Sequence, residues 1–141
     1  MKTTNRLVPG YPIPVSERLY RTLVQYIEQQ GQQRASSVTL NFRDQSYSAD
    51  EGGYHPVEIN VQRKGNEWHI LYITDFAYMG NYYPELERNM DFDFGNGQAF
   101  VAYMGWQPIR SRGVRDLYRL WERNFLSYLK IGAYDSISVN D

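Results

Sequence analysis

The sequence predicts an α+β fold, in which two amphipathic helices pack on an antiparallel sheet built from hairpins. Three observations indicate this class: helical apolar periodicity in two segments, strand-like alternation in the residues between them, and glycine-containing turns that join neighbouring strand segments. Single strands do not alternate with helices, as they do in parallel sheets. We therefore expect an N-terminal helix, four or five strands and a C-terminal helix packed on the sheet, with "AYDSISV" as a candidate C-terminal edge strand.

The first helix is predicted over residues 17–30. Its apolar residues recur three and four positions apart, Ser16 is suited to cap its start, and Gly31 is suited to end it. Before it, the three prolines of "VPGYPIPV" exclude a helix, so residues 1–15 are expected to form an extended arm. The second helix has a wide apolar face over about 18 residues and ends before Gly132.

The strands are predicted from the alternation of apolar and polar residues. The segments "SSVTLNFR" and "HPVEINVQRK" each read as half-buried strands, and the turn at 64–67 joins the second of them to "WHILYITDFAYM". This last segment is apolar on both faces, which predicts a central strand. The turn at 95–97 predicts a hairpin between "MDFDF" and "QAFVAYM", whereas "NYYPELERN" and "GWQPIRSRG" are interpreted as loops.

Length and composition limit the class of protein. A chain of 141 residues with 42% hydrophobic residues is expected to fold as one domain, 1–141. The absence of cysteine excludes thiol catalysis, disulfides and thiolate metal sites. No run approaches the roughly 20 apolar residues of a membrane span, and no signal peptide is recognised, so a cytoplasmic protein without a membrane partner is expected.

The net charge of −1 hides a separation of charge along the chain. Residues 44–99 carry ten acidic and three basic side chains, whereas residues 1–43 and 100–130 each carry six basic and two acidic ones. Opposite charges on one small body can pair within the molecule, pair between subunits or steer a charged partner. The sequence leaves these three alternatives open.

The segment "FRDQSYSADEGGYHPVEI", residues 42–59, is the principal candidate for a functional surface. It crowds charged groups, aromatic rings, a Gly-Gly pair and a histidine between two strands. We expect a non-enzymatic binding or accessory module that recognises a protein partner or a second copy through this loop and the tyrosines of the next one, with no cofactor. The predicted binding residues are Arg43, Asp44, Tyr47, Glu51, Tyr54, His55, Glu58, Tyr78, Tyr82 and Tyr83.

A metal-assisted hydrolase that uses Asp44, Glu51 and His55 is an alternative interpretation of the same loop. These side chains offer oxygen and nitrogen ligands, but their spacing matches no established metal motif. A structural role is the simpler interpretation, in which His55 closes the loop by hydrogen bonds and Gly52 and Gly53 supply backbone angles that other residues resist.

Two further groups of charged residues are notable. Asp91 and Asp93 share one face of a predicted strand, and we interpret them as an exposed acidic face that opposes edge pairing. The second helix carries a stripe of arginines opposite its apolar face, which predicts phosphate contacts in a nucleic-acid accessory protein. The pI near 6.1 favours a solvated or internally paired face instead. The stripe consists of Arg112, Arg115, Arg119 and Arg123.

Four runs carry a resemblance to a known family: "FRDQSYSADEGGYHPVEI", "YITDFAYMG", "ELERNMDFDF" and "LWERNFLSYLKIGAYD". Across roughly residues 36–139 the chain resembles a family of small uncharacterised bacterial proteins, a domain of unknown function met chiefly in marine gammaproteobacteria. The resemblance implies a stand-alone bacterial domain without an assigned activity and provides no family catalytic residues.

Overall fold

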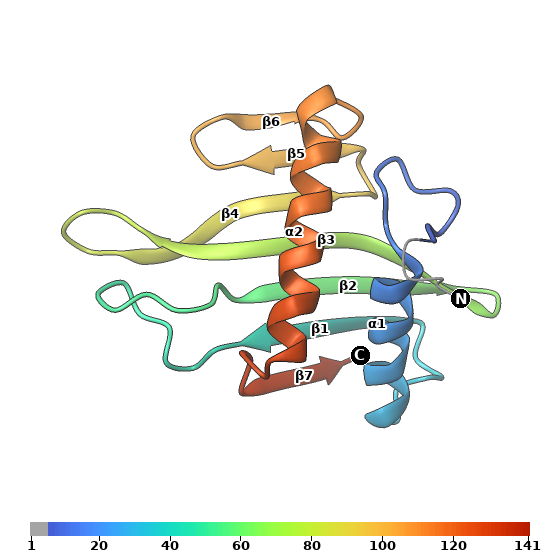
Figure 1. Cartoon of the computed structure of the whole chain (residues 1–141). Coiled ribbons are helices and arrows are strands. Elements are labelled where there is room, and N and C mark those ends of the chain that lie inside the picture. Colours follow the sequence, from blue (N-terminus) through green and yellow to red (C-terminus); the bar gives the residue numbers. More distant parts are fainter. Residues whose placement is uncertain (1–5) are drawn as a thin grey trace.

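Seven antiparallel strands form one sheet, in the order β6-β5-β4-β3-β2-β1-β7 (Figure 1). The computed structural model describes residues 6–141. The α+β class is therefore confirmed, with more strands than predicted. In chain order the elements are α1 (Glu17–Gln29), β1 (Ser37–Arg43), β2 (Val57–Lys64), β3 (Glu67–Met79), β4 (Glu85–Asp93), β5 (Gln98–Val101), β6 (Gly105–Pro108), α2 (Arg112–Lys130) and β7 (Ser136–Asn140).

Both helices lie on the same face of the sheet, and α2 crosses the strands (Figure 1). The helix α1 begins where predicted, because the Ser16 hydroxyl accepts a hydrogen bond from the Leu19 backbone N–H at 3.1 Å. Its buried residues Leu19, Leu23 and Ile27 are the predicted apolar stripe. None of the helices in the described chain is long and apolar enough to cross a membrane.

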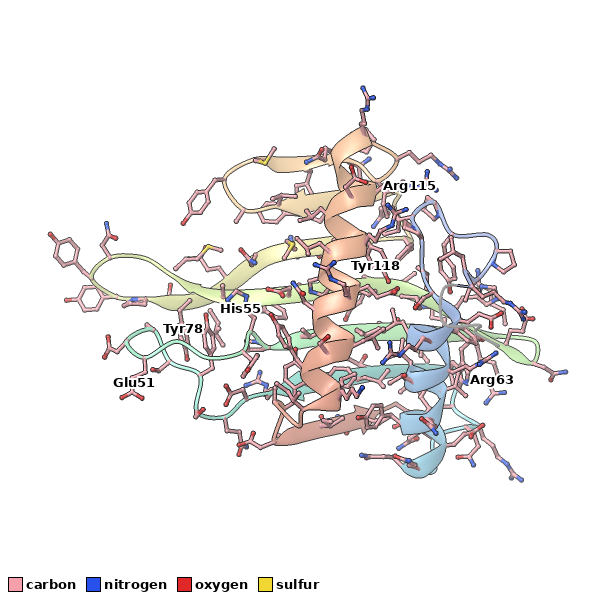
Figure 2. All side chains as sticks on the ribbon, viewed as in Figure 1. Glu51, His55, Arg63, Tyr78, Arg115 and Tyr118 are labelled. Carbon is pink, nitrogen blue, oxygen red and sulfur yellow. The ribbon has the colours of Figure 1, made fainter. Side chains whose placement is uncertain are left out.

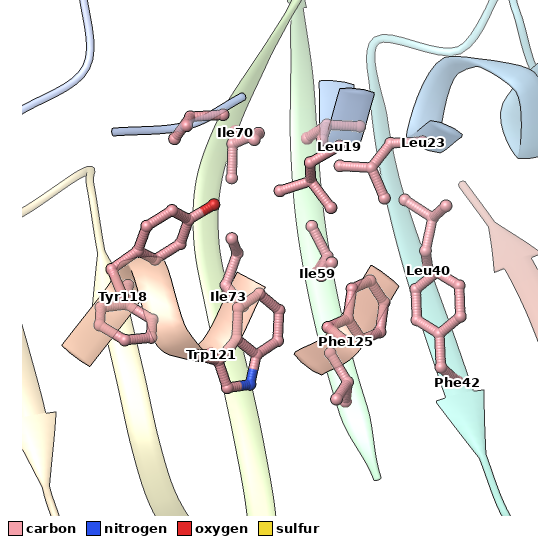
Figure 3. Packing of buried hydrophobic residues seen from close by; sticks show 14 of the residues in the cluster. Leu19, Leu23, Leu40, Phe42, Ile59, Ile70, Ile73, Tyr118, Trp121 and Phe125 are labelled. Atoms are coloured by element: carbon pink, nitrogen blue, oxygen red, sulfur yellow. The ribbon is translucent and has the colours of Figure 1, made fainter. Parts of the chain in front are cut away.

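The core lies between the two helices and the covered face of the sheet (Figure 3). Phe42 of β1 is at its centre and is fully buried. Its ring lies 5.7 Å from that of Tyr26 on α1, 5.0 Å from that of Phe125 on α2 and 6.0 Å from that of Tyr134. The side chain of Phe42 thus packs against both helices from the sheet.

Two segments predicted as loops belong to strands. The residues of "NYYPELERN" from Glu85 onward are part of β4 and pair with the second half of β3. The side chains of residues 85–88 are all exposed, so the segment lacks the alternation that identifies a strand. The segment "GWQPIRSRG" contains β6, which has only four residues and pairs with β5.

The central and edge positions agree with the sequence. The strand β3 is the fourth of the seven, as its apolar character on both faces predicts, and the last four residues of "AYDSISV" belong to the edge strand β7, which pairs with β1. The hairpin of β3 and β4 projects beyond the part of the sheet that the helices cover (Figure 1). It thereby carries the 80–84 loop away from the core.

Asp91 contradicts the interpretation of an exposed acidic face. It lies on the sheet face opposite the helices, yet it is only 5% exposed, because its cross-strand neighbours Thr74 and Phe100 flank it. One carboxylate oxygen lies 3.1 Å from the Arg88 guanidinium, while the other has no hydrogen-bond partner among the described residues. Burial raises the pKa of Asp91 to about 6, although the charge of Arg88 opposes this rise.

We expect Asp91→Asn to stabilise the fold in a pH-dependent way. Because the pKa of Asp91 is higher in the folded state, ionisation disfavours folding, and the contribution of Asp91 to wild-type stability falls as pH rises from about 4 to above 6. A neutral amide avoids this loss. The gain in unfolding free energy from the substitution should grow by on the order of 2 kcal/mol between about pH 4 and pH 7, as urea denaturation can measure. A gain of the same size at both pH values would contradict the assignment.

Candidate functional site

The 44–56 loop and the 80–84 loop lie at the same end of the sheet (Figure 2). Tyr47 joins the 44–56 loop to the end of β3: its hydroxyl oxygen accepts a hydrogen bond from the Tyr78 backbone N–H at 3.0 Å. The Tyr47 ring also lies 5.1 Å from the ring of Tyr78 and 5.4 Å from that of His55. Three of the predicted binding residues therefore form one aromatic cluster.

Asp44 holds the loop in shape. One carboxylate oxygen accepts hydrogen bonds from the backbone N–H and hydroxyl of Ser46 at 3.0 and 2.6 Å, and the other accepts one from the Tyr54 N–H at 3.0 Å. The bond from the Ser46 hydroxyl, followed by that from Tyr54, lowers the pKa of Asp44. Gly53 is required beside it, because its φ is +136° and a Cβ there would lie 2.8 Å from the Asp44 carboxylate.

His55 turns toward β3 and pairs with Asp75, whose carboxylate oxygen lies 2.9 Å from its Nδ1. Asp75 is nearly buried and also accepts hydrogen bonds from the Asn89 amide and the Trp121 indole N–H, each at 3.2 Å. The bond to Asp75 raises the pKa of His55, and burial opposes this rise in part. Because Asp75 accepts the Nδ1 proton, Nε2 is the ring nitrogen left for a ligand.

A pocket of about 290 Å³ opens beside this pair, between α2 and the strands β3 and β4. Its polar groups include His55 and the amides of Asn89 and Asn124, while much of the remaining wall is aliphatic and aromatic. A mainly apolar cavity with a few convergent polar groups is the usual form of a small-molecule site. The other lining residues are Gly53, Tyr54, Asp75, Met90, Leu117, Leu120, Trp121, Phe125, Tyr128 and Tyr134.

The predicted metal ligands do not converge. Both carboxylate oxygens of Asp44 accept bonds from its own loop, Glu51 is exposed in the turn, and His55 faces Asp75. Within residues 6–141, no three His, Asp or Glu side chains are arranged to hold a metal ion. The loop thus offers the hydrolase alternative no ligand set in the described chain.

The remaining predicted residues lie outside the pocket, except Tyr54, whose ring packs edge-on against that of Tyr128. Arg43 and Glu58 border a separate hollow, and Glu58 accepts a hydrogen bond from the Tyr72 hydroxyl. Tyr82 and Tyr83 are about 90% exposed at the tip of the hairpin. The predicted surface is therefore divided into a pocket, an exposed tip and a part on the open sheet face. The exposed fractions are 90% for Tyr82 and 89% for Tyr83.

The sequence-based prediction missed the partners that give the pocket its polarity. The sequence does mark Asp75 as a candidate site residue, because it is the only carboxylate within the apolar run "YITDFAYM" and a buried charge needs partners. The sequence does not mark Trp121 as a site residue, because it lies in the apolar stripe of α2 like any other core residue of that helix.

The arginines of α2 are all exposed, as predicted for a surface stripe. Within the described chain, only Arg119 has an ion-pair partner, Asp116 at 3.7 Å, and both side chains are largely exposed. No ion pair of the described residues joins the acidic segment 44–99 to the basic segments on either side. Of the three alternatives for the separated charges, pairing within the molecule is therefore wrong for these residues.

Two solved structures from Vibrio cholerae are similar to this chain. The hypothetical protein VC0508 of the VSP-II pathogenicity island is 51% identical, with a TM-score of 0.85, and the match covers 96% of this chain and all of that one. The conserved hypothetical protein VC1805 of the pathogenicity island VPI-2, described as structurally homologous to the human P32 protein, is 45% identical with a TM-score of 0.84. That match covers 93% of this chain and 98% of the other.

A comparison with curated proteins finds no match. The family model of DUF2787, proteins of unknown function, matches residues 17–140, which include both helices and all seven strands. This range contains the four runs on which the resemblance was based. The chain belongs to the DUF2787 family, a family of bacterial proteins whose function is unknown.

Proposed function

We propose that the protein is a non-enzymatic binding module and that its recognition site is the His55 pocket together with the adjoining loop. The observation that carries this proposal is the pocket itself. The predicted loop contributes its histidine to a preformed and mostly apolar cavity. Binding rather than catalysis is supported by the lining, because its described residues include no serine, threonine or lysine that could act as a nucleophile. Burial also raises the pKa of the Tyr134 hydroxyl, which keeps it protonated.

The test is a titration with benzyl alcohol, a neutral probe whose ring fits the apolar part of the pocket. The reporter is the indole N–H of Trp121, which lies at the pocket wall and is one of three tryptophan signals in a proton–nitrogen NMR spectrum. We expect a saturable shift of the Trp121 signal while those of Trp68 and Trp106, which do not line the pocket, stay in place. No saturable shift of Trp121 with benzyl alcohol, or with analogues bearing an acidic or basic group, would refute the proposal.

Two matched variants locate the binding. Leu120→Phe adds volume at a half-exposed residue of the pocket wall and should weaken binding of the probe. Ile131→Phe adds an aromatic ring at an exposed residue outside the pocket and should leave binding unchanged. Equal affinities for the two variants would place the probe elsewhere.

A second candidate function is polyanion binding by the exposed arginine face of α2, which is favoured because no ion pair within residues 6–141 joins these arginines to the acidic segment. If these side chains contact phosphates, the affinity for a short DNA or RNA duplex should fall steeply as salt concentration rises. In fluorescence anisotropy, Arg115→Gln and Arg123→Gln should each weaken binding and reduce the salt dependence, whereas Arg21→Gln on α1 should not. Absent or salt-independent binding would exclude this function.

A further inference from the structure

We propose that the ligand of the His55 pocket carries a carboxylate on a small apolar body, and that this carboxylate binds the Nε2–H of His55. This inference rests on the proposed binding function, and it names the chemical class that the site selects.

Among the described residues that line the pocket, His55 alone can carry a positive charge. The wall that α2 contributes consists of apolar and aromatic residues and Asn124, without a lysine or arginine. The 53–55 segment and the segment before β7 contribute tyrosines, and Asp75 of β3 is the one acid. An anionic ligand group therefore has a single charged partner in this pocket, and it is the imidazolium of His55.

Asp75 does not offer its negative charge to a ligand. Its two oxygens accept hydrogen bonds from His55, Asn89 and Trp121, and the residue is only 7% exposed. With three of its roughly four acceptor positions in use and the residue nearly buried, Asp75 leaves a ligand ammonium group little access to its charge. A carboxylate can instead accept a hydrogen bond from the Nε2–H of His55, because Asp75 already occupies Nδ1.

The cavity limits the rest of the ligand. A volume of about 290 Å³ is at the lower end for small-molecule sites, so a group the size of a single aromatic ring fits and a large ligand does not. The flanking rings of Phe125 and Tyr128 and the side chain of Leu117 provide the apolar contact. A compact aromatic or aliphatic monocarboxylic acid satisfies both the charge and the volume.

Binding of such an acid should depend on pH through His55. Asp75 already raises the pKa of His55, so the imidazolium persists toward neutral pH, and it is lost as pH rises through that pKa. The other titratable groups around His55 are Tyr47, Tyr54, Tyr78 and, across the pocket, Tyr128 and Tyr134. By reciprocity, the bound acid must raise the pKa of His55 further.

The experiment compares benzoate, benzyl alcohol and benzylamine, which share one ring and differ in charge. At about pH 6 we expect benzoate to bind best and benzylamine to bind worst, and the benzoate affinity should fall about tenfold by pH 9. The affinity for benzyl alcohol should not change. Nuclear magnetic resonance of the two histidines provides an independent readout, because benzoate should raise the pKa of His55 and leave that of the distant His69 unchanged.

The outcomes separate this inference from the proposed function. If none of the three probes shifts the NMR signal of the Trp121 indole N–H, both the proposed binding function and the carboxylate assignment are refuted. Binding of benzyl alcohol as tight as that of benzoate at both pH values keeps the pocket but overturns the carboxylate assignment, and so does a preference for benzylamine. His55→Gln retains an amide donor without the charge, so its benzoate affinity should be lower at pH 6 and independent of pH. Unchanged pH dependence in this variant would also overturn the inference.

Discussion

The variant Phe42→Ala is expected to lose about 3–5 kcal/mol of unfolding free energy, the largest loss that we predict for a single substitution. Phe42 is fully buried and contacts the rings of Tyr26, Phe125 and Tyr134. Alanine leaves a cavity at the point where β1, α1 and α2 meet, and the surrounding rings belong to three different segments that cannot all close it. Since small domains have about 5–15 kcal/mol of stability, the variant should be close to unfolding at room temperature.

Urea denaturation followed by tryptophan fluorescence measures this loss. The control is Tyr103→Ala, which removes an aromatic side chain that is 95% exposed, and its effect should stay within about 0.5 kcal/mol. A loss at Phe42 below about 1 kcal/mol would show that the two helices do not depend on this contact.

The second large effect is expected for Asp75→Ala, with a loss of about 2–4 kcal/mol. The substitution removes the acceptor for the indole N–H of Trp121, which lies in the buried core, and for His55 and Asn89. The indole N–H of Trp121 then lacks a partner where water reaches poorly, and His55 and Asn89 lose a charged acceptor beside the pocket. The loss exceeds that of an ordinary surface hydrogen bond because the missing acceptor is charged and buried.

The loss at Asp75 should also depend on pH. Asp75 raises the pKa of His55 in the folded state, so this contribution to stability is complete below the unfolded pKa near 6.5 and is lost as pH rises through the folded pKa. The variant lacks this contribution. The difference between wild type and Asp75→Ala should therefore be larger at about pH 6 than at about pH 9. Asn89→Ala, which removes one neutral donor, should cost about 1 kcal/mol without this trend.

Most of the fold follows from the sequence because the core-facing elements have regular apolar periods. The stripe of α1, the alternation of β1 and β2 and the apolar character of β3 each reflect a contact with the core, and all of them were predicted. The strand residues 85–88 escaped prediction because they touch no core, and β6 escaped because four residues that include Gly105 and Pro108 show no period. Apolar periodicity arises where one face of an element is buried. Residues 85–88 and β6 belong to the sheet through backbone pairing with their neighbouring strands instead.

The candidate site was predicted only in part, for a different physical reason. The loop with His55 stands out locally, because histidine, Gly52 and Gly53 are unusual together. Its partners come from β3, β4 and α2, and only the tertiary structure brings them together. The turn of His55 toward Asp75, away from Asp44 and Glu51, depends on the hydrogen bonds that fold the loop back on itself, which the spacing of residues does not show.

The pairing of β1 with β7 has a consequence for synthesis in the cell. Roughly 90 residues separate the two strands along the chain. At a translation rate of about 5–20 residues per second, the edge of β1 that pairs with β7 therefore stays unpaired for several seconds or longer after β1 is synthesised. During that interval nascent chains on one polysome expose identical unpaired edges to each other. Slow translation of the downstream segment, or overproduction at high temperature, should therefore lower the yield of native protein through aggregation, even where the finished domain is stable.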